Sequence, residues 1–70
     1  MSSEVRAYIR HIRAARICAA GARHWFAQQG WSWQDFLREG RPAADFEATG
    51  DHFAAQVAEL ARQEAANGSR

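Results

Sequence analysis

Apolar positions recur at helical spacing between residues 18 and 29. Gly30 follows this run and supplies the residue type that most often ends a helix. The pattern predicts a helix over residues 18–29 that turns one apolar face inward. The positions of this face, at i, i+3, i+4, i+7, i+8 and i+11, are Cys18, Gly21, Ala22, Trp25, Phe26 and Gln29.

The residues that follow Gly30 predict the start of a second helix. Ser32 can act as an N-cap and Asp35 then stands at N3. Trp31, just before the cap, can pack against Phe36 at N4 as a hydrophobic staple. The glycine at position 40 predicts that this helix is short and that the chain breaks at residues 40–41.

Two further helices are predicted in the C-terminal half. Pro42 suits the first turn of a short helix that runs to Ala48 and buries Phe46. Asp51 is a good N-cap for the last helix. The apolar face of that helix, again at helical spacing, consists of Phe53, Val57, Leu60 and Ala61.

The N-terminal stretch has two interpretations. Tyr8, Ile12 and Ala15 have helical spacing, whereas residues 5, 7 and 9 are apolar and alternate with polar residues as in a short strand. We favour a helix that includes residues 4–10, with the strand as the alternative.

Together these elements predict an all-α fold. Residues 1–70 form one domain, a bundle of three to four short helices beside the ambiguous N-terminal stretch, with residues 1–3 and 67–70 frayed. Such a small domain needs its large side chains inside, and a buried aromatic residue contributes about 2–3 kcal/mol from its area. The predicted core is Ile12, Cys18, Ala22, Trp25, Phe26, Trp33, Phe36, Leu37, Phe46, Phe53, Val57 and Leu60.

Cysteine and histidine usage argues against a metal site or a disulfide. Cys18 is the only cysteine, and we interpret it as a small core residue rather than a nucleophile. His11, His24 and His52 are not spaced like a paired zinc-binding motif. We therefore expect no cofactor and no metal.

Catalytic patterns are likewise lacking. No nucleophile-base pair and no glycine-rich phosphate loop is recognisable, and the carboxylate pairs have the spacing of helix caps and surface pairs. We expect a protein that is not an enzyme. The first residues lack the basic and apolar segments of a signal peptide, and no apolar run reaches the roughly 20 residues that span a bilayer. No membrane association is expected.

Charge is unevenly distributed although the net charge is only +1. Residues 1–24 carry five Arg and one acid, whereas residues 25–70 carry four Arg and seven acids, about +4 against −3. The basic stretch can contact phosphates, or it can be a solvated or protein-binding face. Arg and Trp are favoured at protein interfaces. The predicted interaction surface is Arg6, Arg10, Arg13, Arg16, Arg23 and Trp31.

The order of several of these residues resembles a family. It is Arg13, Cys18, Gly21, Arg23 and Trp25-Phe26, then Gly30, Trp33-Gln34-Asp35-Phe36-Leu37 and Gly40, and lastly Ala48-Thr49-Gly50-Asp51. Over residues 8–61 this is similar to small, largely uncharacterised proteins encoded by tailed phages and prophages of Gram-negative bacteria. Where that family often has His-Gly-Leu-Asp-Trp, residues 29–33 are Gln-Gly-Trp-Ser-Trp, which conserves the staple and the cap. The resemblance brings no site residues with it.

The resemblance implies a phage or prophage accessory protein that works by protein-protein contact. Such a protein would be an assembly factor, a minor virion component or a modulator of a host protein, in the bacterial host cytoplasm or in the virion. Self-association into a homo-oligomer is compatible with this function, because a small helical domain can bury its aromatic faces against a second copy. The alternative is a small Arg-rich regulator that binds nucleic acid.

Overall fold

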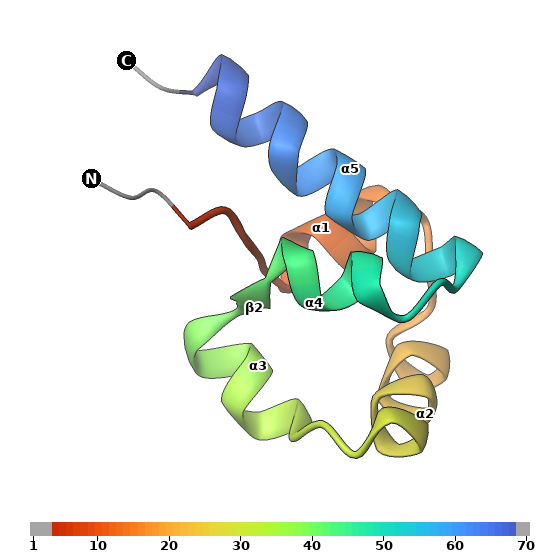
Figure 1. Ribbon diagram of the computed structural model, residues 1–70. Helices are drawn as coiled ribbons and strands as arrows, with labels where there is room; N and C mark the ends of the chain where they lie inside the picture. The colour runs from red at the N-terminus through yellow and green to blue at the C-terminus, as the bar shows by residue number, and fades with distance from the viewer. Residues whose placement is uncertain (1–3, 69–70) are drawn as a thin grey trace.

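The protein is described by a computed structural model of residues 4–68. Helices make up most of the described chain, beside one pair of two-residue strands (Figure 1). The predicted all-α class is therefore confirmed. The described residues form five helices rather than three to four. The elements are β1 (Arg6–Ala7), α1 (Ile9–Ala14), α2 (Ala19–Gln29), α3 (Trp33–Glu39), β2 (Arg41–Pro42), α4 (Ala43–Ala48) and α5 (His52–Asn67).

The chain ends were expected to fray at residues 1–3 and 67–70. Residues 1–3 and 69–70 lie outside the described part of the chain. Asn67 is the last residue of α5, and the N–H of Gly68 donates to the carbonyl of Glu64 at 2.7 Å. The last helix therefore extends one residue into the segment that was expected to be frayed.

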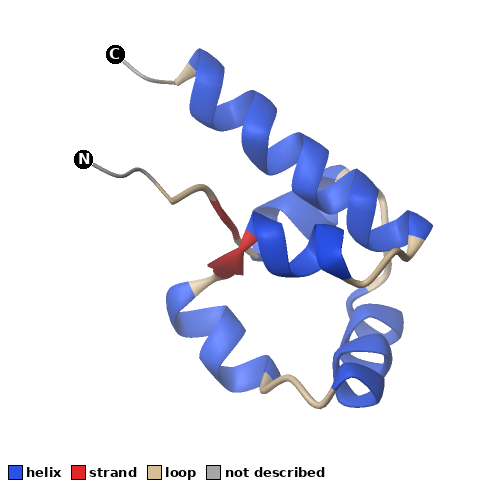
Figure 2. Cartoon of the chain, viewed as in Figure 1, coloured by secondary structure: helices blue, strands red, loops and turns tan. Residues whose placement is uncertain are grey.

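The prediction of a helix over residues 4–10 is wrong for residues 4–8, although residues 9 and 10 belong to α1. β1 pairs antiparallel with β2, and the two short strands lie beside each other in Figure 2. The N–H of Ala43 also donates to the carbonyl of Val5 at 2.8 Å. The alternation of apolar residues explains the strand, because Ala7 is fully buried while its neighbours are only half-buried. The first helix starts later, at Ile9.

α2 ends with a Schellman motif at a glycine, as predicted. The N–H of Gly30 donates to the carbonyl of Ala27 and the N–H of Trp31 to that of Phe26, both at 3.0 Å. Gly30 has φ +77°, a left-handed conformation that glycine adopts without a steric penalty. The Trp31 ring then folds back on Phe26, with 5.4 Å between ring centroids.

α1 ends with the same motif but without a glycine. The N–H of Arg16 donates to the carbonyl of Arg13 at 2.9 Å, and the N–H of Ile17 to that of Ile12 at 3.3 Å. Arg16 therefore occupies the position that Gly30 occupies after α2, and its φ is +63°. It is the one non-glycine residue with positive φ within residues 4–68.

α3 begins and ends as its sequence predicts. The hydroxyl of Ser32 accepts a hydrogen bond from the N–H of Asp35 at 3.2 Å. Gly40 ends the helix with φ +75° and is buried. A Cβ at this position would lie 2.5 Å from the ring of Tyr8, so only glycine fits between α3 and the N-terminal segment.

α4 and α5 form the closest helix pair. Pro42 precedes the first turn of α4, which buries Phe46 as predicted. Asp51 caps α5, since its carboxylate accepts the N–H of Phe53 at 2.9 Å. α5 runs over both α4 and α1 (Figure 1), and its buried face includes small residues that allow close approach. The buried residues of α5 are Ala54, Val57, Ala58 and Ala61.

Three phenylalanines from three different helices form the centre of the core. Phe26, Phe36 and Phe46 are at most 2% exposed. Their ring centroids are 4.7 Å apart for Phe26 and Phe36 and 5.9 Å apart for Phe26 and Phe46. Trp25 stacks on Phe46 at 6.1 Å from outside this centre. The core thus joins α2, α3 and α4 through aromatic packing.

Six of the twelve predicted core residues are buried, four are half-buried, and two positions are wrong because they are exposed. Cys18 is exposed because it precedes α2 in an extended conformation and so does not share the apolar face of the helix. Leu37 is 48% exposed because α3 is short and Phe36 already occupies its inward side. The fully buried predicted residues are Ile12, Ala22, Phe26, Phe36, Phe46 and Val57, and the half-buried ones are Trp25, Trp33, Phe53 and Leu60.

Candidate interaction surface

Arg6 was predicted to belong to an interaction surface, but its guanidinium is engaged within the chain. Its Nε donates to the carbonyl of Glu39 at 3.0 Å and its Nη2 to the carbonyl of Gly40 at 3.1 Å. Its Nη1 also pairs with Glu4 at 2.9 Å. Arg6 therefore satisfies carbonyl groups at the end of α3 and joins β1 to that end.

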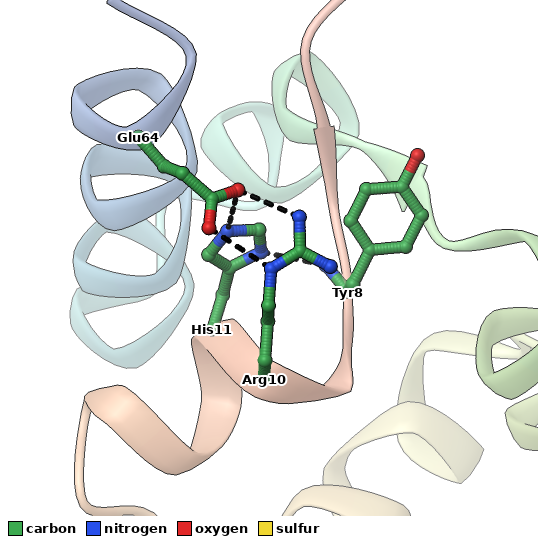
Figure 3. A network of polar contacts seen from close by, with 4 residues as sticks. All are labelled: Tyr8, Arg10, His11 and Glu64. Carbon is green, nitrogen blue, oxygen red and sulfur yellow. Dashed lines mark hydrogen bonds and ion pairs between the residues drawn. The ribbon is translucent and has the colours of Figure 1, made fainter. Parts of the chain in front are cut away.

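Arg10 is part of a polar network that ties α1 to α5 (Figure 3). Its Nε and Nη2 donate to the two carboxylate oxygens of Glu64 at 2.9 and 2.7 Å, a two-point contact. Its guanidinium also lies 4.8 Å from the ring centroid of Tyr8. The contacts hold Glu64 as an anion, and the pKa of its carboxyl falls to about 2 because of the hydrogen bonds from Arg10 and His11.

His11 completes this network from its buried position. Its Nδ1 accepts the backbone N–H of Tyr8 at 2.8 Å, and its Nε2 lies 3.0 Å from the Glu64 carboxylate. Nε2 therefore carries the proton that is donated to Glu64. A histidine beside a carboxylate is also an arrangement used in catalysis, but here both ring nitrogens are engaged and the side chain is 4% exposed. The network therefore stabilises the contact between α1 and α5, and neither ring nitrogen of His11 is free to act as a base.

Every carboxylate in residues 4–68 has a partner within the chain. Asp51 accepts the indole N–H of Trp25 at 3.1 Å in addition to capping α5. Glu59 accepts the side-chain amide of Gln63 at 2.9 Å, and its charge also helps raise the pKa of Arg62. The remaining acids pair with arginines: Glu4 with Arg6, Asp35 and Glu39 with Arg38, Asp45 with Arg41, Glu47 with Arg62, and Glu64 with Arg10.

Three arginines among residues 4–68 do not take part in this pairing. Arg13, Arg16 and Arg23 are exposed, and none of them pairs with a carboxylate in the described part of the chain. They lie on α1, on the connection between α1 and α2, and on α2. Within the described residues, the unneutralised positive charge is therefore concentrated in one segment, residues 13–23.

Two shallow hollows lie against the first turns of α5, next to this segment. The larger, of about 440 Å³, is formed by α5 and the end of α1 and is lined by Ala15, His52, Ala55, Gln56, Glu59 and Leu60. The second, of about 300 Å³, lies between α2 and α5 and is lined by Ile17, Gly21, Ala22, Trp25 and Phe53. Both linings are mainly apolar, and the sequence neighbours Ala15 and Ile17 line one hollow each.

Trp31, the last predicted surface residue, lies apart from this region. It is half-buried, with its ring 5.2 Å from that of Phe46 on one side and the Arg41 guanidinium 4.0 Å from its centroid on the other. Arg41 in turn has its Nε 3.1 Å from a carboxylate oxygen of Asp45. Trp31 is thus mainly a structural residue, covered by a cation that its own chain provides.

The remaining reactive side chains do not meet in one place. His24 and His52 are exposed, while His11 is buried beneath Glu64. No group of three or more possible metal ligands occurs among residues 4–68. Cys18 is exposed at the start of α2, where hydrogen bonds from the backbone N–H groups of Gly21 and Ala20 lower the pKa of its thiol.

The chain matches no family model, no curated protein and no solved structure. Among the helices of residues 4–68, none has the length and apolar character needed to cross a bilayer. The two hollows beside residues 13–23 have mainly apolar linings, to which His52, Gln56 and Glu59 add polar groups.

Sequence patterns selected Arg13, Arg16 and Arg23 as candidate surface residues but gave no indication of the hollows. His52, Ala55 and Gln56 are exposed residues of α5 that do not belong to its predicted apolar face, so periodicity gave no reason to select them. A signal for the Arg16 conformation does exist in the sequence. Ile12 and Ile17 are spaced five apart around Arg16, as Phe26 and Trp31 are around Gly30, and that spacing accompanies a Schellman motif.

Proposed function

We propose that this chain is a non-enzymatic accessory protein of a phage or prophage that acts by binding another protein. Its roles would be those of an assembly factor, a minor virion component or a modulator of a host protein. The genomic setting comes from the sequence resemblance. The binding mode is supported by two observations on residues 13–23: Arg13, Arg16 and Arg23 are exposed and unpaired within residues 4–68, and other residues of the same segment help to line two mainly apolar hollows against α5.

Apolar hollows next to unpaired charge favour a protein partner. A protein surface can fill the hollows with apolar side chains and meet the arginines with carboxylates. Six of the eight acids of residues 4–68 pair with other arginines, and none pairs with Arg13, Arg16 or Arg23. The partner would supply the missing anionic groups.

The test is capture of partners from phage-infected or lysogenic bacteria with the immobilised full chain. The double substitution R13E/R16E reverses charge beside the hollows. R38E/R62E changes the net charge equally, on α3 and the far part of α5. Because it also breaks the ion pairs of Arg38 with Asp35 and of Arg62 with Glu47, it serves as the control only if it melts close to the original chain. We expect a specific partner to be retained by the original chain and by R38E/R62E and to be lost with R13E/R16E.

Thermal melting of the variants separates binding from folding. Because Arg13 and Arg16 make no ion pair within residues 4–68, R13E/R16E should melt close to the original chain. A partner retained equally by both double variants would place the interface elsewhere. Failure to capture any partner would contradict the proposal.

A nucleic-acid-binding function is the second candidate, and the clustering of three unpaired arginines in residues 13–23 favours it. Three phosphate contacts imply a weak interaction whose affinity falls about forty-fold between 50 and 200 mM salt. Titration of duplex DNA into the labelled chain at both salt concentrations measures this. Binding with that salt dependence, abolished by R13E/R16E, would favour the second candidate over the first.

A further inference from the structure

His11 is the one buried polar or charged residue among residues 4–68. It stands at the N3 position of α1, and its Nδ1 accepts the backbone N–H of the N-cap residue Tyr8 at 2.8 Å (Figure 3). A side chain at N3 that binds back to the N–H of the N-cap residue is one half of a capping box. The first turn of α1 holds no acidic residue. His11 therefore acts as a cap at the junction of β1 and α1, which comprises residues 7–9.

This cap requires a neutral imidazole ring. In the neutral form the lone pair of Nδ1 receives the N–H of Tyr8, and the hydrogen on Nε2 is donated to Glu64 at 3.0 Å. An imidazolium ring carries a hydrogen on both nitrogens. A hydrogen on Nδ1 would point at the N–H of Tyr8, so two donors would face each other without an acceptor. The protonated ring cannot keep both contacts in this geometry.

The charges around His11 decide which contact survives protonation. Glu64 of α5 faces Nε2 as an anion, and the same carboxylate binds the guanidinium of Arg10 on α1. On the N-terminal side, the uncharged ring of Tyr8 lies 5.9 Å from the imidazole ring, and Arg6 of β1 is bound to the end of α3. A positive ring gains attraction from the carboxylate and no acceptor on the N-terminal side. It therefore keeps Glu64 and gives up the backbone of Tyr8.

Release of the Tyr8 backbone affects the packing of the N-terminal segment on the end of α3. A Cβ at Gly40 would lie 2.5 Å from the ring of Tyr8 and 2.7 Å from the carbonyl oxygen of Ala7, so these groups fit closely. Ala7 also pairs with Arg41 in the two-stranded sheet. A backbone that turns at Tyr8 to find a new acceptor for its N–H loosens this close fit. The proton count of His11 thus reaches the contact between β1 and the end of α3.

We propose that His11 is a pH-sensitive cap, which closes the junction of β1 and α1 when the ring is neutral and opens it when the ring is protonated. The contact between His11 and Glu64 stays in place in both states. This inference goes beyond the proposed binding function and does not depend on it.

The direction of the pH response follows from proton binding. The closed junction has no room for a proton on Nδ1, whereas the open junction exposes an imidazole that can bind one. Acidification therefore favours the open junction. An ordinary imidazole titrates at about pH 6.5, so closure is complete above this range and is lost as the pH falls through and below it.

The test is NMR spectroscopy of the isotope-labelled full chain between about pH 7.5 and about pH 5. The ring nitrogens of His11 report its tautomer and its second proton. The protection factor of the Tyr8 amide, which is its exchange rate corrected for the intrinsic effect of pH, reports the junction. We expect this factor to fall by at least roughly ten-fold as the ring of His11 takes up its second proton.

Two amides at the end of α1 serve as internal controls. The N–H groups of Ala15 and Ile17 donate to the carbonyls of His11 and Ile12. Their protection factors should not change over the same range. The reason is that the pKa of Glu64 is about 2, so its carboxylate still holds α1 on α5.

Two substitutions separate the contacts of the imidazole ring. His11→Asn places an amide oxygen near the position of Nδ1, so it can accept the N–H of Tyr8 but cannot take up a proton. The Tyr8 protection factor should then change less than about two-fold with pH. His11→Gln can donate to Glu64 but leaves the Tyr8 N–H without an acceptor, so protection of Tyr8 should already be low at neutral pH. His24→Gln/His52→Gln removes the two exposed histidines and should leave the response of Tyr8 unchanged.

Three results would overturn the inference, and the original chain alone can give each of them. The first is a constant Tyr8 protection factor while the ring of His11 takes up its second proton. The second is a ring that stays neutral, with Tyr8 protected, over the whole range. The third is a parallel loss of protection at Tyr8, Ala15 and Ile17, which would mean that all of α1 detaches. An undiminished response of Tyr8 in His11→Asn would assign the response to another group and would also contradict the inference.

Discussion

The ends of α1 and α2 are two versions of the same motif. Both have the Schellman pattern of hydrogen bonds, and in both a large apolar residue after the end packs toward the helix. α2 has Gly30 at the left-handed position and α1 has Arg16. The other two residues in residues 4–68 with positive φ, Gly40 and Gly50, are glycines as well.

The two helix ends differ in whether the sequence uses the residue that would stabilise the fold most. At α2 the sequence follows the local rule, and Trp31 after Gly30 packs on Phe26 in the aromatic core. At α1 the rule is broken by a residue that costs about 1 kcal/mol in backbone strain and carries an exposed, unpaired charge. The two ends are also held differently, one by aromatic rings and the other by the contacts of Arg10 and His11 with Glu64.

The largest expected effect comes from removing the anchor of the α2 end. Phe26→Ala should lower the free energy of unfolding by about 3–5 kcal/mol, because the ring is fully buried against Phe36 and Trp31. Urea denaturation followed by circular dichroism measures the change. Leu37→Ala is the control and should change stability by less than about 0.5 kcal/mol, since Leu37 is 48% exposed. Equal losses would contradict the described core.

The next largest effect is expected when an arginine is placed at the left-handed position after α2. Gly30→Arg should destabilise the protein by about 1–2 kcal/mol, because φ is +77° there and a Cβ would meet nothing within 4 Å, so that backbone strain alone is added. Gln29→Arg, one residue earlier in exposed helix, controls for the added charge. If both variants unfold at the same urea concentration, the left-handed conformation has no measurable cost in this fold.

The reciprocal change, from arginine to glycine at the left-handed position after α1, should stabilise the fold. Arg16→Gly is expected to raise the free energy of unfolding by about 0.5–1 kcal/mol, because glycine adopts φ +63° without strain but is more flexible when unfolded. Arg16→Ala removes the charge and keeps the strain, so it should leave stability nearly unchanged. Stabilisation by alanine but not by glycine would indicate charge repulsion rather than strain as the cost of Arg16.

The smallest expected effect is local and depends on pH. The pKa of Glu64 is lowered to about 2 from an ordinary value of 4.5, so its contribution to stability is complete above pH 4.5 and is lost as the pH falls toward 2. The protection factors of α1 amides, which are exchange rates corrected for the intrinsic effect of pH, should therefore fall over this range before those of amides around Phe26 and Trp31. In Glu64→Gln, protection in α1 should already be low at pH 6 and should change less on acidification. Simultaneous loss of protection at both ends would contradict independent anchoring.

The residues that begin and end the helices were the most predictable part of the fold. Gly30, Ser32, Gly40 and Asp51 act locally, through backbone conformations and hydrogen bonds that depend on a few neighbouring residues. The inward position of Phe46 followed from the same local pattern. These features need no knowledge of the rest of the chain.

The misplaced residues depend on distant contacts or on helix boundaries. The strand at Arg6–Ala7 forms only because β2 lies beside it, some 35 residues later in the chain. Cys18 has the right spacing for the apolar face but falls one position before α2 begins. Distant contacts also explain why two of the predicted surface arginines are engaged within the chain. Arg6 contacts Glu39 at the end of α3, and Arg10 contacts Glu64 in α5.

The network around Glu64 has a consequence for protein synthesis. Arg10 and His11 leave the ribosome more than 50 residues before the carboxylate that they contact. Their segment therefore remains without its partner until Glu64 has emerged, which happens after every residue of the aromatic core of α2, α3 and α4. A contact so far apart in sequence is also slow to form, so docking of the first helix onto the last completes the fold.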